Sequence, residues 1–417
     1  MIPAALSERA QAAATRLADD LAAPPPPPSD DDGGPASIRW REQSLAAGAA
    51  GIAILPAVRA RAGLGPWDRV HAWLALAARE ELSAGPGAGL WYGAPAVAFA
   101  IRTAAPEGTY RTAISDLDRA VCALAVARLD AARTRMATGA RPSRREYDLV
   151  HGLTGLGAYL LRFQPDTDLT RQLLTYLVRL TEPLRAGDQA GAHAPGWWTS
   201  DVPSGQPAGL FAEGFADLGM AHGITGPLAL LALAMRQGVT VPGHGAAIER
   251  ICGWLDCWRQ DGPAGPWWPE RVTYQELREA RCLHPGPRRP SWCYGTPGIA
   301  RAQQLAGLAT GDEGRQATAE HALAACLTDP AQIAQLTGPG LCHGLAGTLL
   351  TAWHAAADAR TPGIGATVPG LLDALLSDVS ADPRPGLIEG TAGAAATLHA
   401  ITRRPAAPGW EICLLLN

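Results

Sequence analysis

The sequence predicts an all-α protein in which about seven inner helices are covered by about seven outer helices, forming an α/α toroid. The main observation is a weak repeat with seven copies along the chain, in which two glycines spaced by three residues open an apolar helical segment; one faint copy has Ala96 in place of the second glycine. Segments such as GPLALLALAM are apolar on nearly all sides, so these helices must be buried beneath others. A closed ring meets this requirement, because it leaves no terminal repeat exposed.

The copies of the repeat differ in clarity. Two are faint, GAAGIAILPAV from Gly48 and YGAPAVAFAI from Tyr92, and a chance origin is the alternative for them. Five are clear: HGLTGLGAYLL, HGITGPLALLALA, YGTPGIARAQQLA, HGLAGTLLTAWHAA and EGTAGAAATLHA. Successive leading glycines, from Gly48 to Gly390, are 45 to 72 residues apart, which leaves room for a second helix and loops. The repeating unit is therefore a helix pair, and polar residues just before the glycines are expected on one face of the ring.

The N-terminal region differs in composition from the rest of the chain. Residues 4–22 predict a helix, and the segment LAAPPPPPSDDDGGPAS combines a stiff proline run with a stretch that has no apolar content. We therefore predict an N-terminal helix and linker over residues 1–37 and a toroid domain over residues 38–417.

Composition and charge exclude several classes of protein. A net charge of −4 gives no general basic surface for phosphate backbones, so nucleic acid is not an expected partner. No apolar run approaches the roughly 18 residues of a membrane span, and Glu8, Arg9 and Arg16 interrupt the N-terminus where a secretion signal would be apolar. Eight scattered cysteines indicate reduced thiols rather than a disulfide framework. We expect a cytoplasmic protein.

Cysteine and histidine occur just before two of the repeat glycines. Cys293 precedes one repeat, and Cys342 and His343 precede the next at equivalent places. Two sulfurs and one nitrogen are preferred ligands of Zn²⁺, and three ligands leave a fourth position open, as in a catalytic site. One alternative is that these cysteines are small buried hydrophobes, and another is that Cys282 or His284 completes a closed structural site. The remaining cysteines lie in helical or terminal segments and are expected to have no function.

Further polar residues precede other repeats. His222 stands where a proton shuttle would face the metal, although an isolated histidine is more often a satisfied buried side chain. Asp148 is expected either to cap its helix or to orient and charge an active-site base. Arg289, four residues before Cys293, is placed to hydrogen-bond an oxyanion, whereas the alternative is a solvated surface arginine.

Several of these motifs resemble the lanthionine synthetase C-like family, the cyclases of lanthipeptide biosynthesis. The matching segments are YDLVHGLTGLG, MAHGITGPL, WCYGTPGIA, LCHGLAG and GLIEGTAG, which extend over nearly the whole chain. The resemblance implies a seven-fold α/α toroid, with a small inserted domain in class I members, and Zn²⁺ bound by Cys293, Cys342 and His343. A substrate cysteine would take the open position.

The resemblance also implies a reaction and its residues. Positions that match His222 and Asp148 are acid/base groups near the metal in this family, and positions that match Arg289 and Tyr294 line the site. The implied reaction adds a peptide Cys thiol to the β-carbon of dehydroalanine or dehydrobutyrine, which forms a (methyl)lanthionine thioether ring. The enolate would then be protonated at Cα, with His222 or Arg289 as the protonating or stabilising group.

The resemblance further implies partners for a stand-alone class I cyclase. These are a dehydrated precursor peptide with its leader, a separate dehydratase and a transporter, in a complex associated with the membrane. One alternative is a protein on the same toroid that holds zinc and a thiol such as glutathione without cyclising a peptide. Another is a carbohydrate-active enzyme, for which Asp148 and Glu389 would be the carboxylate pair, but that function leaves the Cys and His residues unexplained.

Overall fold

Helices dominate the computed structural model of the chain, which describes residues 2–25, 41–106, 108–184, 194–203, 207–379, 384–403 and 409–417. Most of the predicted linker, residues 26–37, lies outside this part, so the domain boundary between residues 37 and 38 stays a prediction. The chain divides into two compact units. No helix in the described part combines the length and the apolar content that crossing a bilayer demands.

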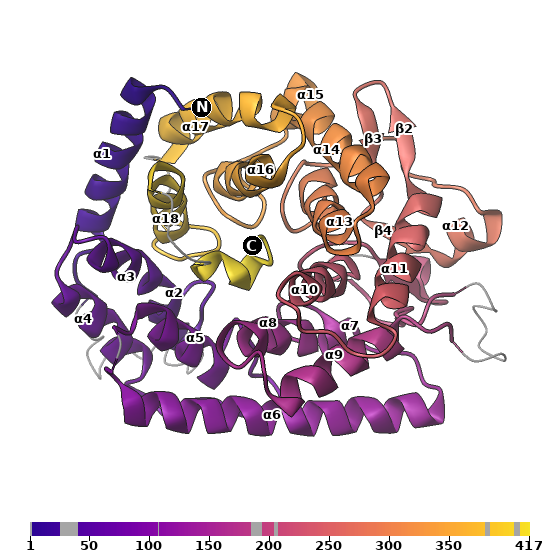
Figure 1. Cartoon of the computed structure of the whole chain (residues 1–417), viewed down its shortest axis with the longest axis horizontal. Coiled ribbons are helices and arrows are strands. Elements are labelled where there is room, and N and C mark those ends of the chain that lie inside the picture. Colours follow the sequence, from indigo (N-terminus) through magenta and orange to yellow (C-terminus); the bar gives the residue numbers. More distant parts are fainter. Residues whose placement is uncertain are drawn as a thin grey trace. The chain divides into compact units, whose positions relative to one another are not determined.

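The first unit comprises Met1–Leu124, Thr337–Trp353 and Val368–Trp410. Its helices are α1 (Ala4–Asp20), η2 (Arg41–Gln43), α2 (Ala49–Ile52), α3 (Ile54–Arg61), α4 (Trp67–Ala77), α5 (Ala94–Ala104), α18 (Thr391–Thr402) and parts of α6 (Arg111–Thr138), α16 (Leu345–Asp358) and α17 (Gly363–Asp378). Figure 1 shows α1 alongside α18, and Arg9 of α1 pairs with Asp373 of α17 at 2.8 Å. The predicted N-terminal helix is thus confirmed and is packed into this unit.

The second unit comprises Ala125–Leu336, His354–Thr367 and Glu411–Asn417. Besides the remaining parts of α6, α16 and α17, its helices are α7 (Arg144–Tyr147), α8 (Leu153–Phe163), α9 (Asp168–Leu180), η3 (Ala208–Phe211), α10 (Thr225–Arg236), α11 (His244–Trp258), α12 (Tyr274–Glu279), α13 (Thr296–Thr310), α14 (Glu313–Thr328), α15 (Pro330–Ile333) and most of η5 (Trp410–Leu414). The last residues of the chain are held here, because the buried Arg301 donates from Nη2 to Leu416 O at 2.7 Å.

Four short strands depart from the helical pattern. Strand β1 (Phe215–Asp217) pairs antiparallel with β4 (Arg271–Thr273), and β2 (Gln260–Gly262) pairs antiparallel with β3 (Gly265–Trp267). The register of the first pair puts Asp217 opposite Arg271, where opposite charges attract across the strands. Strand β3 packs against α14, and all four strands belong to the second unit rather than to a separate inserted domain.

Each of the seven leading glycines precedes a buried helix, so every predicted helix start is confirmed, including the two faint ones. These helices are α2, α5, α8, α10, α13, α16 and α18. In α10, for example, every residue from Thr225 to Ala234 is buried. Among the helices between them, α9 buries one face only. In α9, Leu173, Leu174 and Leu177 are buried while Arg171 is exposed, which is the spacing of an amphipathic helix.

The second glycine of the repeat lies under a backbone carbonyl. A Cβ added to Gly298 would come within 2.2 Å of Trp292 O, and one added to Gly347 would come within 1.8 Å of Leu341 O. In each case the carbonyl belongs to the loop that leads into the helix, so any side chain at the glycine would push that loop away. The same close approach occurs at Gly51, Gly226 and Gly393.

Neighbouring loops are hydrogen-bonded through their backbones. In the second unit, Leu149 N donates to Ala221 O at 3.1 Å, and Met220 N donates to Cys293 O at 2.9 Å. The corresponding bonds in the first unit run from Leu341 N to Ile388 O, from Ile388 N to Ala46 O and from Leu45 N to Trp91 O. The bond between residues 388 and 46 joins the last repeat to the first. Within each unit, these bonds hold the residues just before the leading glycines side by side.

We expect Gly298→Ala to lower the free energy of unfolding by about 1–3 kcal/mol, because its Cβ would overlap Trp292 O and force the preceding loop to move. Urea unfolding of the full chain measures this change. The control is Gly253→Ala in α11, where a Cβ meets nothing within 4 Å; this change is expected to be neutral or stabilising by up to about 1 kcal/mol. Equal effects of the two substitutions would contradict the close-approach argument.

Candidate active site and metal ligands

The predicted site residues lie in the loops before the buried helices. In the second unit these residues are Asp148 and His151 before α8, His222 before α10, and Cys293 and Tyr294 before α13. In the first unit they are Cys342 and His343 before α16, and Glu389 before α18. The backbone bonds between neighbouring loops bring the first of these sets together within its unit.

Asp148 is the centre of a hydrogen-bonded group in the second unit. Its side chain is 1% exposed, and its Oδ1 accepts the backbone N–H groups of His151 at 2.6 Å and of Gly152 at 2.8 Å. Its Oδ2 lies 2.7 Å from His222 Nδ1 and 3.2 Å from His151 Nδ1. Because a carboxylate only accepts hydrogen bonds, we assign a proton to each Nδ1, which leaves each Nε2 free. Asp148 does not cap α8, whose N-cap is Gly152 without a side-chain hydrogen bond; it holds the backbone of the preceding loop and orients two imidazole rings.

The Asp148 group stays charged near neutral pH. Burial alone would raise the pKa of Asp148, but hydrogen bonds from His151 and His222, together with the charges of these rings, outweigh burial and lower the pKa to about 2. Asp148 is consequently a fixed anion that orients its neighbours and is not itself a proton donor.

A cavity of about 600 Å³ adjoins this group. Its polar lining includes Arg144, Arg145, Asp148, His151, His222, Arg271 and Tyr294, all from the second unit. Cavities of this size bind small molecules or short peptide segments. The side chains of His222 and His151 are 32% and 35% exposed, so both rings are accessible from solvent.

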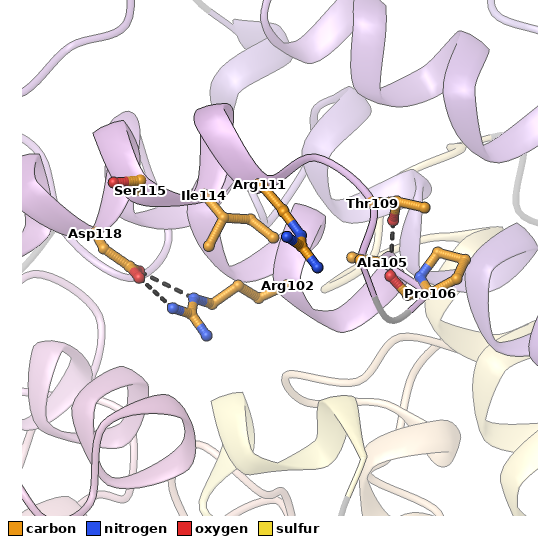
Figure 2. Close-up of a pocket in the computed structure, with 9 residues that line it drawn as sticks. Arg102, Ala105, Pro106, Thr109, Arg111, Ile114, Ser115 and Asp118 are labelled. Carbon is orange, nitrogen blue, oxygen red and sulfur yellow. Dashed lines mark hydrogen bonds and ion pairs between the residues drawn. The ribbon is translucent and has the colours of Figure 1, made fainter.

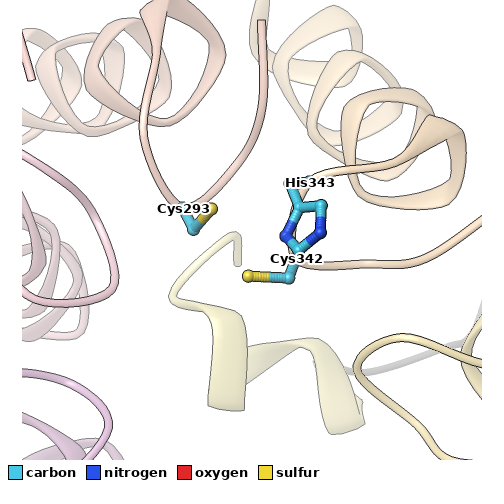
Figure 3. A group of neighbouring side chains, drawn as sticks. All are labelled: Cys293, Cys342 and His343. Atoms are coloured by element: carbon cyan, nitrogen blue, oxygen red, sulfur yellow. The ribbon is translucent and has the colours of Figure 1, made fainter. Parts of the chain in front are cut away.

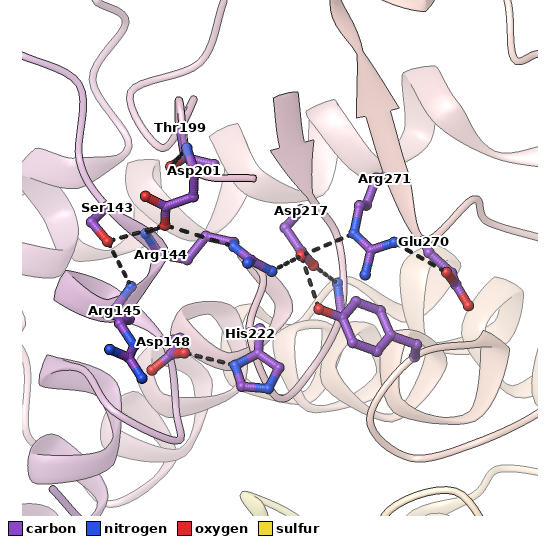
Figure 4. A network of polar contacts seen from close by, with 12 residues as sticks. Ser143, Arg144, Arg145, Asp148, Thr199, Asp201, Asp217, His222, Glu270 and Arg271 are labelled. Atoms are coloured by element: carbon purple, nitrogen blue, oxygen red, sulfur yellow. Dashed lines mark hydrogen bonds and ion pairs between the residues drawn. The ribbon is translucent and has the colours of Figure 1, made fainter. Parts of the chain in front are cut away.

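A second carboxylate, Asp217, holds Tyr294 in place, because its Oδ2 accepts the Tyr294 hydroxyl at 2.9 Å. Asp217 is fully buried, and Figure 4 shows it between two arginines, with Oδ2 3.2 Å from Arg144 Nη1 and 3.5 Å from Arg271 Nε. Burial and the charge of Asp217 raise the pKa of Tyr294, so the hydroxyl stays protonated and donates to Asp217. Tyr294 thus presents its ring rather than a free hydroxyl, and that ring stacks on His222 with centroids 6.3 Å apart.

Three residues of this cluster were not predicted from the sequence: Arg144, Asp217 and Arg271. Asp217 and Arg271 meet across a pair of three-residue strands, which are too short to give a clear alternation of apolar and polar residues. The available signal for Asp217 was a charged residue inside the otherwise apolar segment FADLGM. Arg144, on the short helix α7, gave no signal beyond its proximity to Asp148.

Two other predicted positions lie apart from this cavity. Arg289 is not among its lining residues, and within the described chain Arg289 Nε is buried without a hydrogen-bond partner. His284 lies beside Glu276, with Nε2 3.7 Å from Oε1. Neither Cys282 nor His284 belongs to a described group of side chains that can share a metal ion, so the closed structural site is not supported.

Cys293 is fixed by its own loop and by a neighbouring loop. It is 5% exposed, and its Sγ lies 3.6 Å from Ser291 Oγ. Its carbonyl oxygen accepts the N–H groups of Met220 at 2.9 Å and of Ala221 at 3.4 Å, directly before His222. The position of this cysteine is therefore tied to that of His222 within the second unit.

In the first unit, His343 has a carboxylate partner. Its Nδ1 lies 3.0 Å from Glu389 Oε1, and the adjacent Cys342 donates its backbone N–H to Ile388 O at 3.0 Å. Metal-binding histidines commonly donate the other ring N–H to a carboxylate, which leaves Nε2 for the metal. A Cβ on Gly340 would come within 2.5 Å of Glu389 Oε2, so glycine at this position permits the approach of the carboxylate.

The described part of the chain contains a Cys/His group that could hold a metal ion. Its members, shown in Figure 3, are Cys293, Cys342 and His343. Two cysteine sulfurs and a histidine nitrogen are a donor set that favours zinc. The ligand atoms of His151 and His222 also lie within 4.8 Å of Asp148, but the hydrogen bonds to Oδ2 account for this spacing and no metal is assigned there.

Three of the remaining cysteines are core residues, as predicted from the helical or terminal segments that contain them. Cys252, Cys326 and Cys413 are buried, and burial raises the pKa of the Cys252 and Cys326 thiols to about 12. Such thiols are unreactive near neutral pH. Cys257 is exposed.

Another cavity, of about 490 Å³, lies in the first unit near the start of α6 (Figure 2). It is lined by Arg102, Arg111 and Asp118 among others, and Arg102 is paired with Asp118. No Cys or His lines it, so nothing in its lining suggests metal or thiol chemistry.

Comparison with known proteins identifies the family. The family described as lanthionine synthetase C-like protein matches residues 39–415. The chain belongs to the lanthionine synthetase C-like family. Nisin biosynthesis protein NisC from Lactococcus lactis subsp. lactis is 24% identical over 207 residues, or 49% of this chain and 48% of that protein. The match thus spans about half the length of that relative.

A solved structure has the same fold as this chain. The structure described as Nisin cyclase matches with a TM-score of 0.76 at 17% identity, covering 99% of this chain and 98% of that one. This likeness shows an all-α protein with the fold of an α/α toroid and confirms the fold class predicted from the sequence. The family match likewise confirms the resemblance based on the repeat motifs.

Asp148→Asn is expected to change stability in a pH-dependent way. Because the pKa of Asp148 falls from 3.8 to about 2 on folding, its charged form stabilises the protein above pH 4, and this contribution is lost as the pH falls towards 2. We expect the substitution to lower the free energy of unfolding by roughly 2 kcal/mol at pH 7, and by progressively less as the pH falls from about 4 towards 2. Urea unfolding across this range measures the difference, with the exposed Asp166→Asn as control. A difference that is independent of pH would contradict the assignment.

Proposed function

We propose that this chain is a lanthipeptide cyclase that adds peptide Cys thiols to dehydroalanine or dehydrobutyrine in a zinc-dependent reaction, forming (methyl)lanthionine rings. The observation that carries the proposal is the pair of Asp148 and His222, which faces a cavity of about 600 Å³ in a member of the lanthionine synthetase C-like family. The substrate is a dehydrated precursor peptide, and a separate dehydratase would supply it. A leader sequence and a transporter are further proposed partners.

We assign the metal to Cys293, Cys342 and His343. Their sulfur and nitrogen donors suit zinc, and three protein ligands leave a position open for a substrate thiol. A zinc ion held there supplies a positive centre that lowers the pKa of an entering thiol, while two anionic sulfur ligands preserve its nucleophilicity. Glu389 supports the assignment, because its bond to His343 Nδ1 orients Nε2 as the ligand atom.

The chain's own residues would then handle protons and charge. When sulfur attacks the β-carbon, negative charge develops on the carbonyl oxygen of the dehydro residue, and Cα must receive a proton. His222 is proposed as the proton donor. Asp148 accepts a hydrogen bond from Nδ1, which sets the tautomer and orientation of the ring and leaves Nε2 to face the substrate. Arg144 and Arg271 line the same cavity and favour the developing charge. Arg289 keeps this role only as an implication of the resemblance.

The geometry argues against a carbohydrate-active enzyme. A glycosidase requires one carboxyl group with a raised pKa as its acid, whereas the pKa of Asp148 is lowered to about 2. Glu389 is engaged by His343. A protein that holds zinc and a thiol without forming rings shares the same metal ligands, so measurement of ring formation separates it from a cyclase.

The wild-type protein is expected to contain about one zinc per chain and to cyclise a dehydrated peptide that contains Cys. Cys342→Ala should lose both zinc and cyclisation, because a ligand is removed. Elemental analysis measures the metal. Ring formation leaves the peptide mass unchanged, so it is measured as the loss of alkylatable thiol.

Cys257→Ala is the matched control, since Cys257 is exposed and lies on an outer face of α11; it should keep both zinc and activity. Zinc without ring formation in the wild type would favour the thiol-binding protein. A metal-free protein that still cyclises would overturn the zinc assignment.

Tyr294→Phe tests whether the Tyr294 hydroxyl takes part in the reaction. Because that hydroxyl donates to Asp217, we propose that Tyr294 is a positioning residue whose ring supports His222. The substitution should cost about 1 kcal/mol of stability and reduce kcat by only a few-fold. His222→Asn should reduce kcat by roughly 10²–10⁴-fold. Comparable losses of kcat in the two variants, at equal zinc content, would assign the Tyr294 proton to catalysis.

A further inference from the structure

Two imidazole rings share one carboxylate oxygen in the second unit. Asp148 Oδ2 lies 2.7 Å from His222 Nδ1 and 3.2 Å from His151 Nδ1, and the two rings stack at an interplanar angle of 23°. Both histidines line the cavity of about 600 Å³. An arrangement that served only to orient His222 would need no second imidazole on the same oxygen.

We propose that His151 is a second acid/base residue of the site, so that the two histidines on Asp148 divide the proton transfers of ring formation between them. The proposal rests on the cyclase function proposed for the chain. It follows from the hydrogen bonds to Asp148, which assign both Nδ1 atoms as donors and leave two Nε2 atoms available to the cavity.

The two rings stack with their centroids 5.7 Å apart beside the single negative charge of Asp148. Like charges on rings this close repel each other, so we assign the two rings opposite roles in the proposed step, one as base and the other as acid.

The other charged groups around His151 and His222 are hydrogen-bonded to the backbone, paired with one another or exposed to solvent. Arg128 of α6 donates from Nη1 to the carbonyl oxygen of His151 and fixes its backbone. Arg144, Arg145, Asp201, Arg271 and Tyr294 face the same cavity from α7, the following loops and β4. Arg144 and Arg271 are each paired with the buried Asp217, and the Arg144 backbone N–H donates to Asp201 at 2.7 Å. Arg145 is exposed, so solvent screens its charge.

The proton balance of the proposed step is complete without any further reactant. The S–H bond of the peptide Cys breaks, and its proton passes to Nε2 of the neutral imidazole. The C–S bond forms at Cβ, the Cα=Cβ π electrons move to the enolate, and Cα takes the proton from Nε2 of the protonated imidazole. The pair ends with its proton on the other ring, Asp148 stays a carboxylate throughout, and proton exchange with solvent restores the starting state.

The first test is a spectroscopic one that does not depend on activity. In the full-length protein labelled with ¹⁵N-histidine, the neutral forms of both His151 and His222 are expected to be Nδ1–H tautomers, assigned by comparison with His151→Gln and His222→Gln. A neutral His151 that carries its proton on Nε2 would overturn the proposal, because that ring would then turn its proton away from Asp148.

The second test is kinetic. Glutamine at position 151 can still donate a hydrogen bond to Asp148 but cannot transfer a proton, so His151→Gln should lower kcat by at least about tenfold at unchanged KM and zinc content. It should also remove one limb of the pH profile of kcat. His151→Ala should be partly rescued by added imidazole, which a purely structural role would not allow. The control is His321→Gln, at an exposed histidine of α14, which should keep the wild-type rate.

The outcomes separate this inference from the function on which it rests. If the wild type cyclises and His151→Gln keeps both its rate and its pH profile, His151 is not an acid/base residue although the cyclase function stands. If the wild type does not cyclise a dehydrated peptide, the proposed function fails, and the tautomer measurement still decides whether Asp148 orders both rings. A second zinc in the wild type that is lost in His151→Gln would show a metal site at Asp148 and overturn the proton pair.

Discussion

The site depends on one constraint, the close approach of a loop carbonyl to the second glycine of the repeat, which occurs at Gly51, Gly226, Gly298, Gly347 and Gly393. At Gly298 and Gly347 the carbonyl oxygen stands where a Cβ would otherwise be, so each loop folds back onto the first turn of its buried helix. Folded in this way, a loop exposes its backbone N–H and carbonyl groups to the next loop, and hydrogen bonds such as Met220 N to Cys293 O result. The residues before the leading glycine are thereby held by backbone geometry on both sides, which suits side chains that must keep a fixed orientation.

This constraint also explains which features the sequence predicts. A requirement for glycine is local, so the repeat identified all seven buried helices, and even the faint copies at Gly48 and Gly93 were sound. Asp148 and His222 were found because they occupy equivalent places in that repeat. Asp217, in contrast, acts through partners on another strand and in another loop, and no periodic pattern encodes such a meeting.

Two buried carboxylates of the second unit, Asp217 and Asp148, have different roles because their hydrogen-bond partners differ. Asp217 faces Arg144 and Arg271, which cannot lose their protons, and the raised pKa of Tyr294 keeps that proton in place too. This cluster is electrostatically fixed and serves to position the Tyr294 ring. Asp148 faces two imidazoles instead, the side chains that change charge near neutral pH. A carboxylate beside side chains that can exchange protons, such as Asp148, is suited to a catalytic site. A carboxylate beside side chains that keep their protons, such as Asp217, is suited to holding other residues in position.

A carboxylate bonded to Nδ1 occurs both at the proposed acid/base residue and at the proposed metal ligand. His222 is bonded to Asp148 and His343 to Glu389, each through Nδ1, so each carboxylate orients the Nε2 side of its ring. A ring held in this way can bind a metal or transfer a proton, and the carboxylate does not decide between them. The neighbouring residues determine which role each ring suits. His343 follows Cys342 in the chain, and a thiolate at Cys342 would add a soft ligand and a negative charge, which favour zinc. His222 has no cysteine neighbour in its own loop and stacks on His151 and Tyr294, and without a sulfur donor its Nε2 remains available for protons.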